Sequence, residues 1–376
     1  MKILLFDMDG VLLESLGYHS ALQETVRLMA KSLGFGDLTL SADDIAAFEA
    51  GGINKEWDEA AICTALLLEA AWKLDPKRTL PETLRGPKGS TLNPQSAPDF
   101  NALAHRLSSG DLIEFPPQER AIQRFTETDH FSPVQYQILH ELINGARDPQ
   151  RSLTHRVFQE LVLGSAEYTH TYSLPSVLAC ESYLLKHDIS NLSSAESTHL
   201  QDWLSKPGHS ASVITSRPSR PPAGVFSTPE AELGAELVGL KDIPIVGWGG
   251  LTWLAQQRQT DQQTYVKPSP VHALAAMRVA VGDNQQAALL DAAALVETGE
   301  VGPAWRQFDG AQVFMFEDTP GGIKSLLAAR ETLEKIRISI RPGFLGIARN
   351  PLKKKALLAS GAQVYPSFSQ ALDLAI

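Results

Sequence analysis

Two aspartates stand two residues apart, directly after a short apolar run. Residues 2–6 read Lys-Ile-Leu-Leu-Phe, and Asp7 and Asp9 follow within the sequence Asp-Met-Asp-Gly-Val. Residues two apart in an extended chain point to the same side, so both carboxylates would face one site. Like charges this close repel each other, and a bound cation or a shared proton would relieve the repulsion. The alternative interpretation is a solvated strand end without chemistry.

A second acidic pair follows another apolar run, at residues 313–316. Glu317 and Asp318 come directly after Val-Phe-Met-Phe and precede Thr-Pro-Gly-Gly. Oxygen-rich acids at a strand end favour Mg²⁺ over softer metals. Asp283, within Gly-Asp-Asn, is a competing candidate, but residues 273–281 before it favour a helix over a strand. We therefore place the metal at Asp318 and interpret residues 283–311 as a helical excursion.

Two hydroxyl groups and a lysine could complement these acids. Thr215 and Ser216 follow a predicted strand at residues 211–214. Hydroxyls and free backbone N–H groups suit a phosphate, although such a pair often only caps a helix. Lys267 stands in Lys-Pro-Ser-Pro, where the prolines predict a rigid loop before a helix. A lysine held there could neutralise an anion, whereas a lone lysine is more commonly solvated surface.

Strands and helices alternate after about residue 205, and their order predicts how these residues are held. We expect strands at residues 211–214, 243–246, 312–316, 344–347 and 363–365, and helices at 230–240, 271–279, 322–335 and 352–360. This alternation predicts an α/β fold with a doubly wound, parallel, Rossmann-like sheet. Ligands bind such sheets at the carboxyl ends of the strands, which is where the acidic pairs and the hydroxyls stand.

The rest of the chain predicts a second, helical domain. Apolar residues recur at spacings of three and four through much of residues 14–205, as in amphipathic helices. Prolines and glycines in residues 75–117 predict a long irregular loop with one short helix. Residues 2–6 have no helix partner nearby, so we expect them to join the C-terminal sheet. A mostly α-helical domain would then be inserted between the first two strands.

Composition limits the classes of partner. The 376 residues carry 43 acidic and 33 basic side chains, a net charge of −10, which disfavours binding to nucleic acid or to an anionic membrane. Cys63 and Cys180 are far apart and form no CxxC pair, so we expect no disulfide framework and no zinc site. Apolar runs stay short of the ~20 residues that span a bilayer. These features predict a soluble cytoplasmic protein, and none of them indicates an oligomeric state.

In this order the four motifs resemble the haloacid dehalogenase (HAD) superfamily. The resemblance rests on Asp-x-Asp-Gly-Val, a strand ending in Thr or Ser, Lys-Pro, and an acidic pair before glycine. It implies that residues 1–13 and 206–376 form the α/β core domain and residues 14–205 an inserted helical cap domain. The cap is about twice the usual size for the phosphatase-like members, so it is the part least covered by analogy.

The resemblance also implies a role for each motif residue. Asp7 would be the nucleophile that takes the phosphoryl group, and Asp9 the acid that protonates the leaving oxygen and later activates water. Mg²⁺ would be held by Asp7, the backbone carbonyl of Asp9 and Asp318, with Glu317 in direct or water-mediated contact. Thr215 would bind a phosphate oxygen, with Ser216 beside it. Lys267 would bind the phosphate and stabilise the transferring charge.

These roles predict a Mg²⁺-dependent phosphatase that acts on a small phosphorylated metabolite. Asp9 favours phosphate-ester chemistry, because the dehalogenases of the superfamily lack this acid. Two alternatives stay open. One is a phosphosugar mutase similar to β-phosphoglucomutase, and the other is a non-catalytic scaffold whose large cap binds a protein partner.

Overall fold

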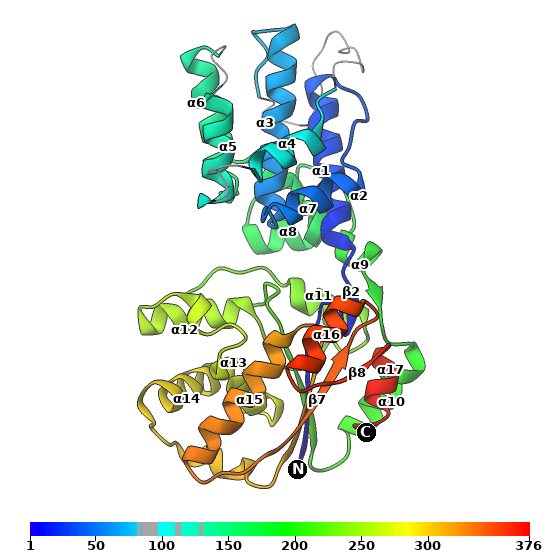
Figure 1. The fold of residues 1–376 in the computed structure, drawn as a ribbon, viewed down its shortest axis with the longest axis vertical. Coiled ribbons are helices and arrows are strands. Elements are labelled where there is room, and N and C mark those ends of the chain that lie inside the picture. Colours follow the sequence, from blue (N-terminus) through cyan, green and yellow to red (C-terminus); the bar gives the residue numbers. More distant parts are fainter. Residues whose placement is uncertain (81–83, 85–96, 110–113, 128–130) are drawn as a thin grey trace. The chain divides into compact units, whose positions relative to one another are not determined.

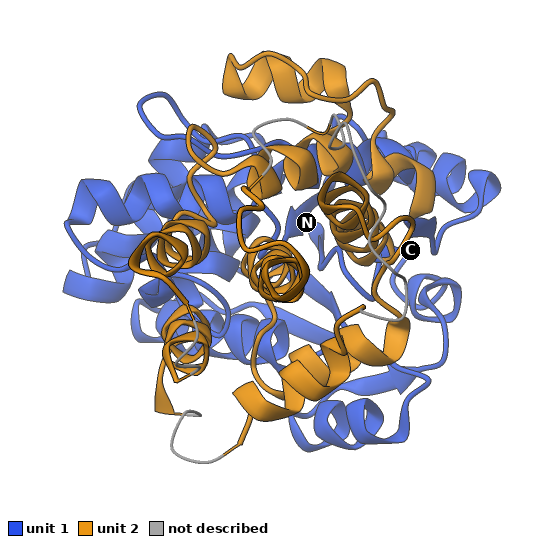
Figure 2. Cartoon of the chain, turned by 90° about the horizontal axis from the view of Figure 1, so that it is seen from above, with its two compact units in different colours: residues 1–15, 188–376 blue, residues 16–187 orange. Residues whose placement is uncertain are grey.

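The computed structural model describes residues 1–80, 84, 97–109, 114–127 and 131–376. They form two compact units, coloured separately in Figure 2. The core unit comprises residues 1–15 and 188–376, and the helical unit comprises residues 16–187. Much of the loop expected at residues 75–117 lies outside the described residues, and a short helix, α4 (Phe100–Leu107), lies in the part that is described.

A six-stranded parallel sheet forms the centre of the core unit, in the order β5-β4-β1-β6-β7-β8. The first strand joins this sheet in a central position, with β4 on one side and β6 on the other. The expected α/β fold with a Rossmann-like sheet is therefore confirmed. The strands are β1 (Lys2–Phe6), β4 (His209–Ile214), β5 (Ile245–Val246), β6 (Gln312–Glu317), β7 (Arg341–Ile347) and β8 (Gln363–Tyr365).

Side chains of β1 alternate between two hydrophobic layers, one on each face of the sheet. Ile3 and Leu5 belong to the layer that contains α12 to α15, and Leu4 and Phe6 to the layer that contains α10, α11 and α17 (Figure 1). A strand buried on both faces reads as a continuous apolar run, which explains residues 2–6. The helices are α10 (Ser194–Leu204), α11 (Glu230–Leu237), α12 (Trp248–Arg258), α13 (Pro270–Ala280), α14 (Gln285–Thr298), α15 (Pro320–Lys335), α16 (Pro351–Ala359) and α17 (Phe368–Leu372), with short 3₁₀ helices η3 (Gln262–Thr264) and η4 (Pro303–Phe308).

The helical unit is built around α1, which packs against α3, α7 and α9. A buried ion pair joins Arg124 to Glu69 at 2.8 Å, and the Glu160 carboxylate accepts the backbone N–H of Val177 at 2.7 Å. In the described ranges no helix is long and apolar enough to cross a bilayer. The helices are α1 (Gly17–Leu33), α2 (Ala42–Ala50), α3 (Glu56–Leu74), α4, α5 (Pro117–Thr126), α6 (Pro133–Asn144), α7 (Leu153–Leu163), α8 (Ser165–Tyr172) and α9 (Tyr183–His187).

The division between the units differs from the expected boundary at residues 205/206. Residues 188–205 belong to the core unit, because β2 (Leu13–Glu14) pairs with β3 (Ile189–Ser190) and α10 packs on the sheet. Leu200 and Trp203 of α10 lie in the same hydrophobic layer as Leu4. The helical unit of the structure thus comprises residues 16–187, whereas the sequence analysis expects an inserted range of 14–205. Helical periodicity alone could not make this distinction, since a core helix and an inserted helix have the same period.

Helix α12 is a second difference, since no helix was expected at residues 248–258. Its first turn contains Gly249, where an added Cβ would lie 2.1 Å from the carbonyl oxygen of Ser219. Close packing therefore requires a residue with poor helix propensity, which hides the helix from sequence reasoning. The expected helical excursion at residues 283–311 is present as α14 and η4.

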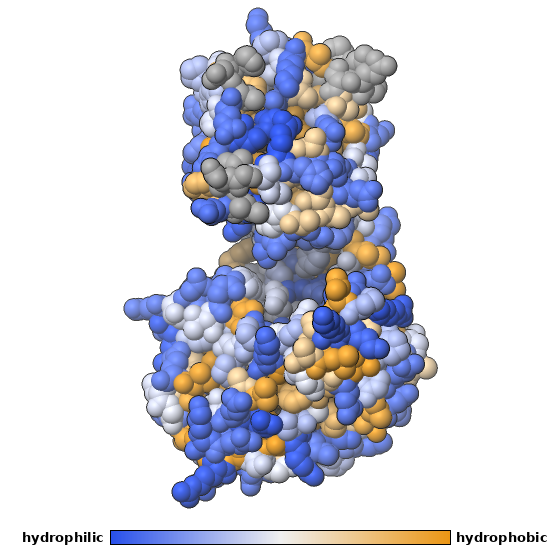
Figure 3. Space-filling view, viewed as in Figure 1, coloured by the Kyte–Doolittle hydropathy of each residue, from blue (hydrophilic) through white to orange (hydrophobic). Residues whose placement is uncertain are grey.

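Apolar side chains are mainly inside these layers. On the face drawn in Figure 3, hydrophobic residues lie in small patches separated by polar and charged ones. The exposed apolar residues include Leu352 and Leu358 of α16.

Candidate active site

The two acidic pairs meet because β1 and β6 are neighbours in register. Phe6 lies beside Phe316, so Asp7 and Glu317 both stand at the carboxyl ends of their strands. The backbone N–H of Asp7 donates to the carbonyl of Phe316 at 3.0 Å, so the pairing of β1 with β6 continues one residue beyond the end of β1. Carboxylate oxygens of Asp7, Glu317 and Asp318 lie within 4.8 Å of one another, and all three residues are buried. Three acids thus share a site of limited access to water.

Lys267 lies directly against two of these acids. Its Nζ is 2.9 Å from Oδ1 of Asp7 and 3.0 Å from Oε2 of Glu317, and its side chain is 8% exposed. Burial would lower the pKa of Lys267, but the charges of Asp7 and Glu317 outweigh burial and raise it above the usual range. Lys267 is therefore a permanent cation. This expected site residue lies in the same cluster as the nucleophile candidate.

A buried histidine, His272, holds the loop that carries Lys267 in place. The backbone N–H of Lys267 donates to Nδ1 of His272 at 3.3 Å, and Nε2 of His272 lies 3.0 Å from the carbonyl of Val246. Burial, with a smaller contribution from the charge of Lys267, lowers the pKa of His272 to about 3. The ring therefore stays neutral at physiological pH, donating to Val246 and accepting from Lys267.

Burial, with a smaller contribution from the charge of Asp7, raises the pKa of both acids at the end of β6. Burial and the charge of Asp7 raise the pKa of Glu317 to about 8, against the opposing charge of Lys267. Burial also raises the pKa of Asp318, although Lys353 donates a hydrogen bond to its Oδ2. Raised pKa values at two neighbouring carboxyl groups indicate that further positive charge would stabilise their ionised forms.

The residues at this edge fit a hard divalent cation. Buried carboxylate oxygens from two strands converge there, and oxygen donors of this kind suit Mg²⁺. The chain also comes very close to the carboxylate of Asp318 at Gly10, which has a φ of +77°. A Cβ at Gly10 would lie 2.3 Å from Oδ2 of Asp318, so only glycine leaves that carboxylate its present position. The backbone at Gly10 thus leaves room for the carboxylate of Asp318.

The side chain of Asp9 lies outside this acidic group and binds Arg217. Nε and Nη2 of Arg217 are 2.7 and 2.6 Å from Oδ1 of Asp9, and Ser15 Oγ donates to the same oxygen. Loss of water around the carboxyl would raise the pKa of Asp9, but the charge and hydrogen bond of Arg217 outweigh it and leave the pKa lowered. The Asp9 side chain is 42% exposed, which leaves it open to a ligand.

The two predicted hydroxyls differ in their surroundings. Thr215 is buried at the end of β4, where its Oγ1 accepts the backbone N–H of Arg217 at 3.1 Å. Ser216 is exposed. The competing acid, Asp283, forms an ion pair with Arg278 in the turn between α13 and α14 and is not among the three acids that converge. Its ion pair gives Asp283 a structural role.

Sequence reasoning missed three charged residues at this edge. Lys353 contacts Asp318, and Arg217 joins Asp9 to Asp188. Lys353 stands in a run of three lysines, and no signal in the sequence distinguishes it from Lys354 and Lys355. For Arg217 a signal existed, because it follows Thr215 by two residues and so stands in the second motif.

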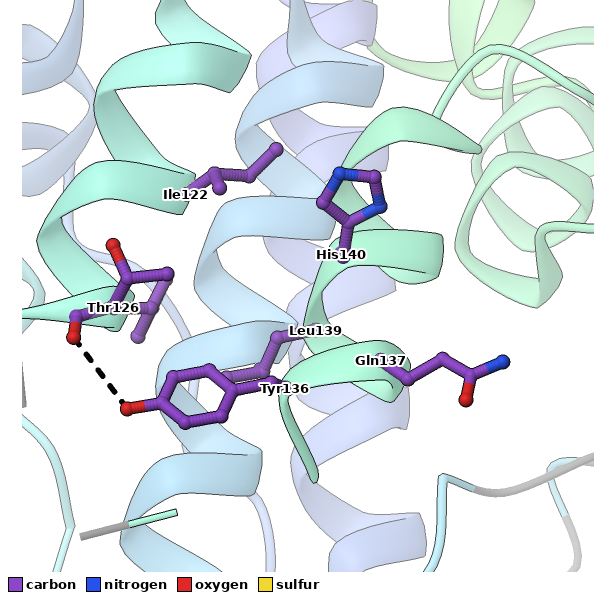
Figure 4. A pocket seen from close by; sticks show the side chains of 7 residues that line it. Ile122, Thr126, Tyr136, Gln137, Leu139 and His140 are labelled. Carbon is purple, nitrogen blue, oxygen red and sulfur yellow. Dashed lines mark hydrogen bonds between the residues drawn. The ribbon is translucent and has the colours of Figure 1, made fainter. Parts of the chain in front are cut away.

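A cavity in the helical unit has a different character. It holds about 350 Å³ between α5 and α6, and its wall includes Ile122, Tyr136 and Leu139 (Figure 4). The hydroxyl of Tyr136 donates to the carbonyl oxygen of Thr126 at 3.4 Å across one side of it. None of the described residues that line this cavity carries a carboxylate.

Fold and site together define a Rossmann-like α/β protein with an inserted helical unit and a buried carboxylate cluster. Its fold is similar to a crystal structure from the Northeast Structural Genomics Consortium, with a TM-score of 0.62 and 17% identity over 100% of this chain and 98% of the other. Identity this low shows the fold alone. No protein-family model and no curated protein matches the chain.

The phosphatase Tt82 from Thermococcus thioreducens is 15% identical over 95% of this chain and 99% of its own, with a TM-score of 0.39. A TM-score that low supports no conclusion about this chain.

Proposed function

We propose that this protein is a HAD-like, Mg²⁺-dependent phosphatase that hydrolyses a small phosphorylated metabolite through an aspartyl-phosphate intermediate. One observation carries the proposal: Asp7, Glu317 and Asp318 converge at the carboxyl ends of neighbouring strands with Lys267 against them. A surface acid cluster would lie in water, whereas these residues are buried with a permanent cation. Burying such charge is costly unless the site uses it.

Asp7 is the nucleophile in this proposal. Its Oδ1 accepts the backbone N–H of Met8 at 2.8 Å and the ammonium of Lys267 at 2.9 Å. Both contacts orient the carboxylate through Oδ1, so Oδ2 is the oxygen that these donors leave for bond formation. Oδ2 attacks phosphorus, and the bond from phosphorus to the leaving oxygen breaks as Asp9 gives that oxygen a proton.

Hydrolysis of the intermediate reverses the role of Asp9. Asp9 takes a proton from water, the water oxygen bonds to phosphorus, and the bond to Asp7 breaks to release inorganic phosphate. Lys267 stabilises the charge of the transferring group in both steps. Asp7, the carbonyl of Asp9, Asp318 and Glu317 would hold Mg²⁺, whose charge when bound lets a carboxylate approach a phosphate dianion.

The first test is phosphate release from a panel of phosphorylated metabolites, with Mg²⁺ and with excess chelator. We expect release that depends on Mg²⁺ in the wild-type chain and in Asp283→Asn, which changes the competing acid. Asp318→Ala should lower both Mg²⁺ binding and turnover. Undiminished activity in chelator would refute the metal assignment, and turnover of a sugar phosphate without phosphate release would favour a mutase.

Intact-protein mass then separates the two leading acids. With a phosphate ester that has a good leaving group, Asp9→Asn should accumulate an adduct of one phosphoryl group, because the base for the second step is missing. Asp7→Asn should form no adduct, since the nucleophile is gone. The reverse pattern would exchange the roles of the two residues and overturn the mechanism.

A further inference from the structure

Arg217 is buried among three residues that come from both segments of the core unit, two from residues 1–15 and one from residues 188–376. Its Nη2 lies 2.6 Å from Oδ1 of Asp9, 2.9 Å from Oδ2 of Asp188 and 2.9 Å from Oγ of Ser15. The side chains of Arg217 and Asp188 are 2% and 0% exposed. An arginine in this setting has a fixed direction, because its planar fork must satisfy several acceptors at once.

The backbone of Arg217 is also held in place. Its N–H donates to Oγ1 of Thr215 at 3.1 Å, and its carbonyl accepts the N–H of Trp248 at 3.0 Å. At Gly247 an added Cβ would lie 3.0 Å from that carbonyl oxygen, so the chain packs closely around it. Because the N–H and the carbonyl of Arg217 are both hydrogen-bonded, its guanidinium has little freedom to move. It can therefore hold a neighbouring side chain in one orientation.

Charge balance alone does not explain the contact with Asp9. The buried carboxylate of Asp188 already neutralises Arg217. Nε and Nη2 nevertheless both reach Oδ1 of Asp9, and Ser15 donates to the same oxygen. Nε of Arg217 and Oγ of Ser15 both donate to Oδ1 of Asp9, so Oδ2 is the oxygen that these two donors leave for proton transfer.

We propose that Arg217 is a positioning residue for Asp9, with Asp188 and Ser15 holding Arg217 in turn. The inference rests on the proposed function, in which Asp9 exchanges a proton with the leaving group and with water. Arg217 selects Oδ2 as the proton-carrying oxygen and keeps it directed into the site. Misplacing a reacting group by about 1 Å can cost on the order of 10²-fold in rate.

The test compares two substrates that differ in their need for acid. p-Nitrophenyl phosphate has a good leaving group and needs little protonation, whereas phenyl phosphate needs more. For Arg217→Gln we expect kcat to fall about 10²-fold with phenyl phosphate and less than about 10-fold with p-nitrophenyl phosphate. KM should change little. Arg217→Lys should restore little of the loss, because an ammonium lacks the planar fork.

Two further variants separate positioning from folding. Arg217→Gln combined with Asp188→Asn removes both buried charges, so no unpaired carboxylate is left inside, and it should show the same substrate dependence. Ser15→Ala removes one donor to Asp9 and one acceptor of Arg217 but keeps both charges of the buried ion pair, so it should show a smaller difference between the two substrates. Arg220→Gln, an exposed arginine in the same segment, is the matched control and should behave as wild type.

The outcomes distinguish this inference from the proposed function. Equal losses with both substrates in Arg217→Gln and in the double variant would reduce Arg217 to a structural role. A loss in Arg217→Gln that adds fully to that of Asp9→Asn would also overturn the inference, since a positioning residue acts only through Asp9. A wild-type chain that hydrolyses neither substrate and forms no phosphoryl adduct would instead overturn the proposed function.

Discussion

Glu317 should make the binding of Mg²⁺ strongly dependent on pH. The carboxyl has a pKa of about 8 in the folded chain, against an ordinary value of 4.5, because it is buried beside Asp7. At pH 7 about 0.9 of a proton is therefore bound, and it must leave when a cation takes its place. The cation competes with the proton, so affinity rises with pH and levels off above about pH 8.

The size of the effect follows from this competition. From pH 6 to pH 8 the ionised fraction of Glu317 rises from about 0.01 to about 0.5, which predicts about 50-fold tighter Mg²⁺ binding. Lys267, whose pKa is raised, stays charged throughout this range and adds no slope. In Glu317→Gln most of the pH dependence of Mg²⁺ affinity should vanish. The pH dependence that remains would come from Asp318, whose pKa is also raised.

Isothermal titration calorimetry measures both quantities. Mg²⁺ is titrated into the chain at pH 6, 7 and 8, in buffers with different ionisation enthalpies, and the dependence of heat on buffer counts the protons released. Wild type should release about 0.9 more protons at pH 7 than Glu317→Gln. Glu300→Gln, at an exposed acid, is the control. Equal proton release in wild type and Glu317→Gln would refute the reasoning about Glu317.

Three further outcomes test other parts of the core unit. Lys353→Gln removes the ammonium that competes for Asp318 and should strengthen Mg²⁺ binding about two- to fivefold in calorimetry, whereas Lys354→Gln should not; weaker binding would contradict this. Gly10→Ala places a side chain at a φ of +77° and against Asp318, so calorimetric unfolding should show a loss of about 1–2 kcal/mol and Mg²⁺ affinity should fall at least about tenfold. Unchanged affinity would argue against the close approach. The pKa of His272 is about 3 when folded and 6.5 when unfolded, so the unfolded chain binds the proton first and stability falls by about 1.4 kcal/mol per pH unit from pH 6.5 toward 3. Denaturant unfolding at pH 6.5 and 5 should therefore show a steeper loss in wild type than in His272→Gln, and equal losses would show that the ring is not held neutral.

The main features of the core unit can be predicted because they depend on local patterns. A strand buried on both faces reads as an apolar run, so residues 2–6 and 312–316 are visible in the sequence as mainly apolar runs that acids follow. Parallel strands present their carboxyl ends at one edge, which brings Asp7 close to Glu317 and Asp318. The proximity of Lys267 could be expected from its rigid loop only together with the other motifs.

Other features depend on contacts that no local pattern records. Asp188 looks like one acid among many, yet it is fully buried because Arg217, far away in the chain, reaches it. α10 has the same periodicity as the inserted helices, and only the packing of Trp203 on the sheet assigns it to the core unit. At residues 248–258, close packing requires Gly249, and the poor helix propensity of glycine makes α12 hard to predict from the sequence.

The central position of β1 has a consequence for how the chain folds as it is synthesised. β1 is buried between β4 and β6, and about 300 residues separate it from β6 along the chain. At translation rates of about 5–20 residues per second, this apolar strand waits about 15–60 s for that neighbour. The helical unit, at residues 16–187, is contiguous and emerges complete in the meantime. β4 emerges about 100 residues before β6, so β1 can pair on one side first, and the acidic cluster of Asp7, Glu317 and Asp318 is completed only when β6 is added on the other side.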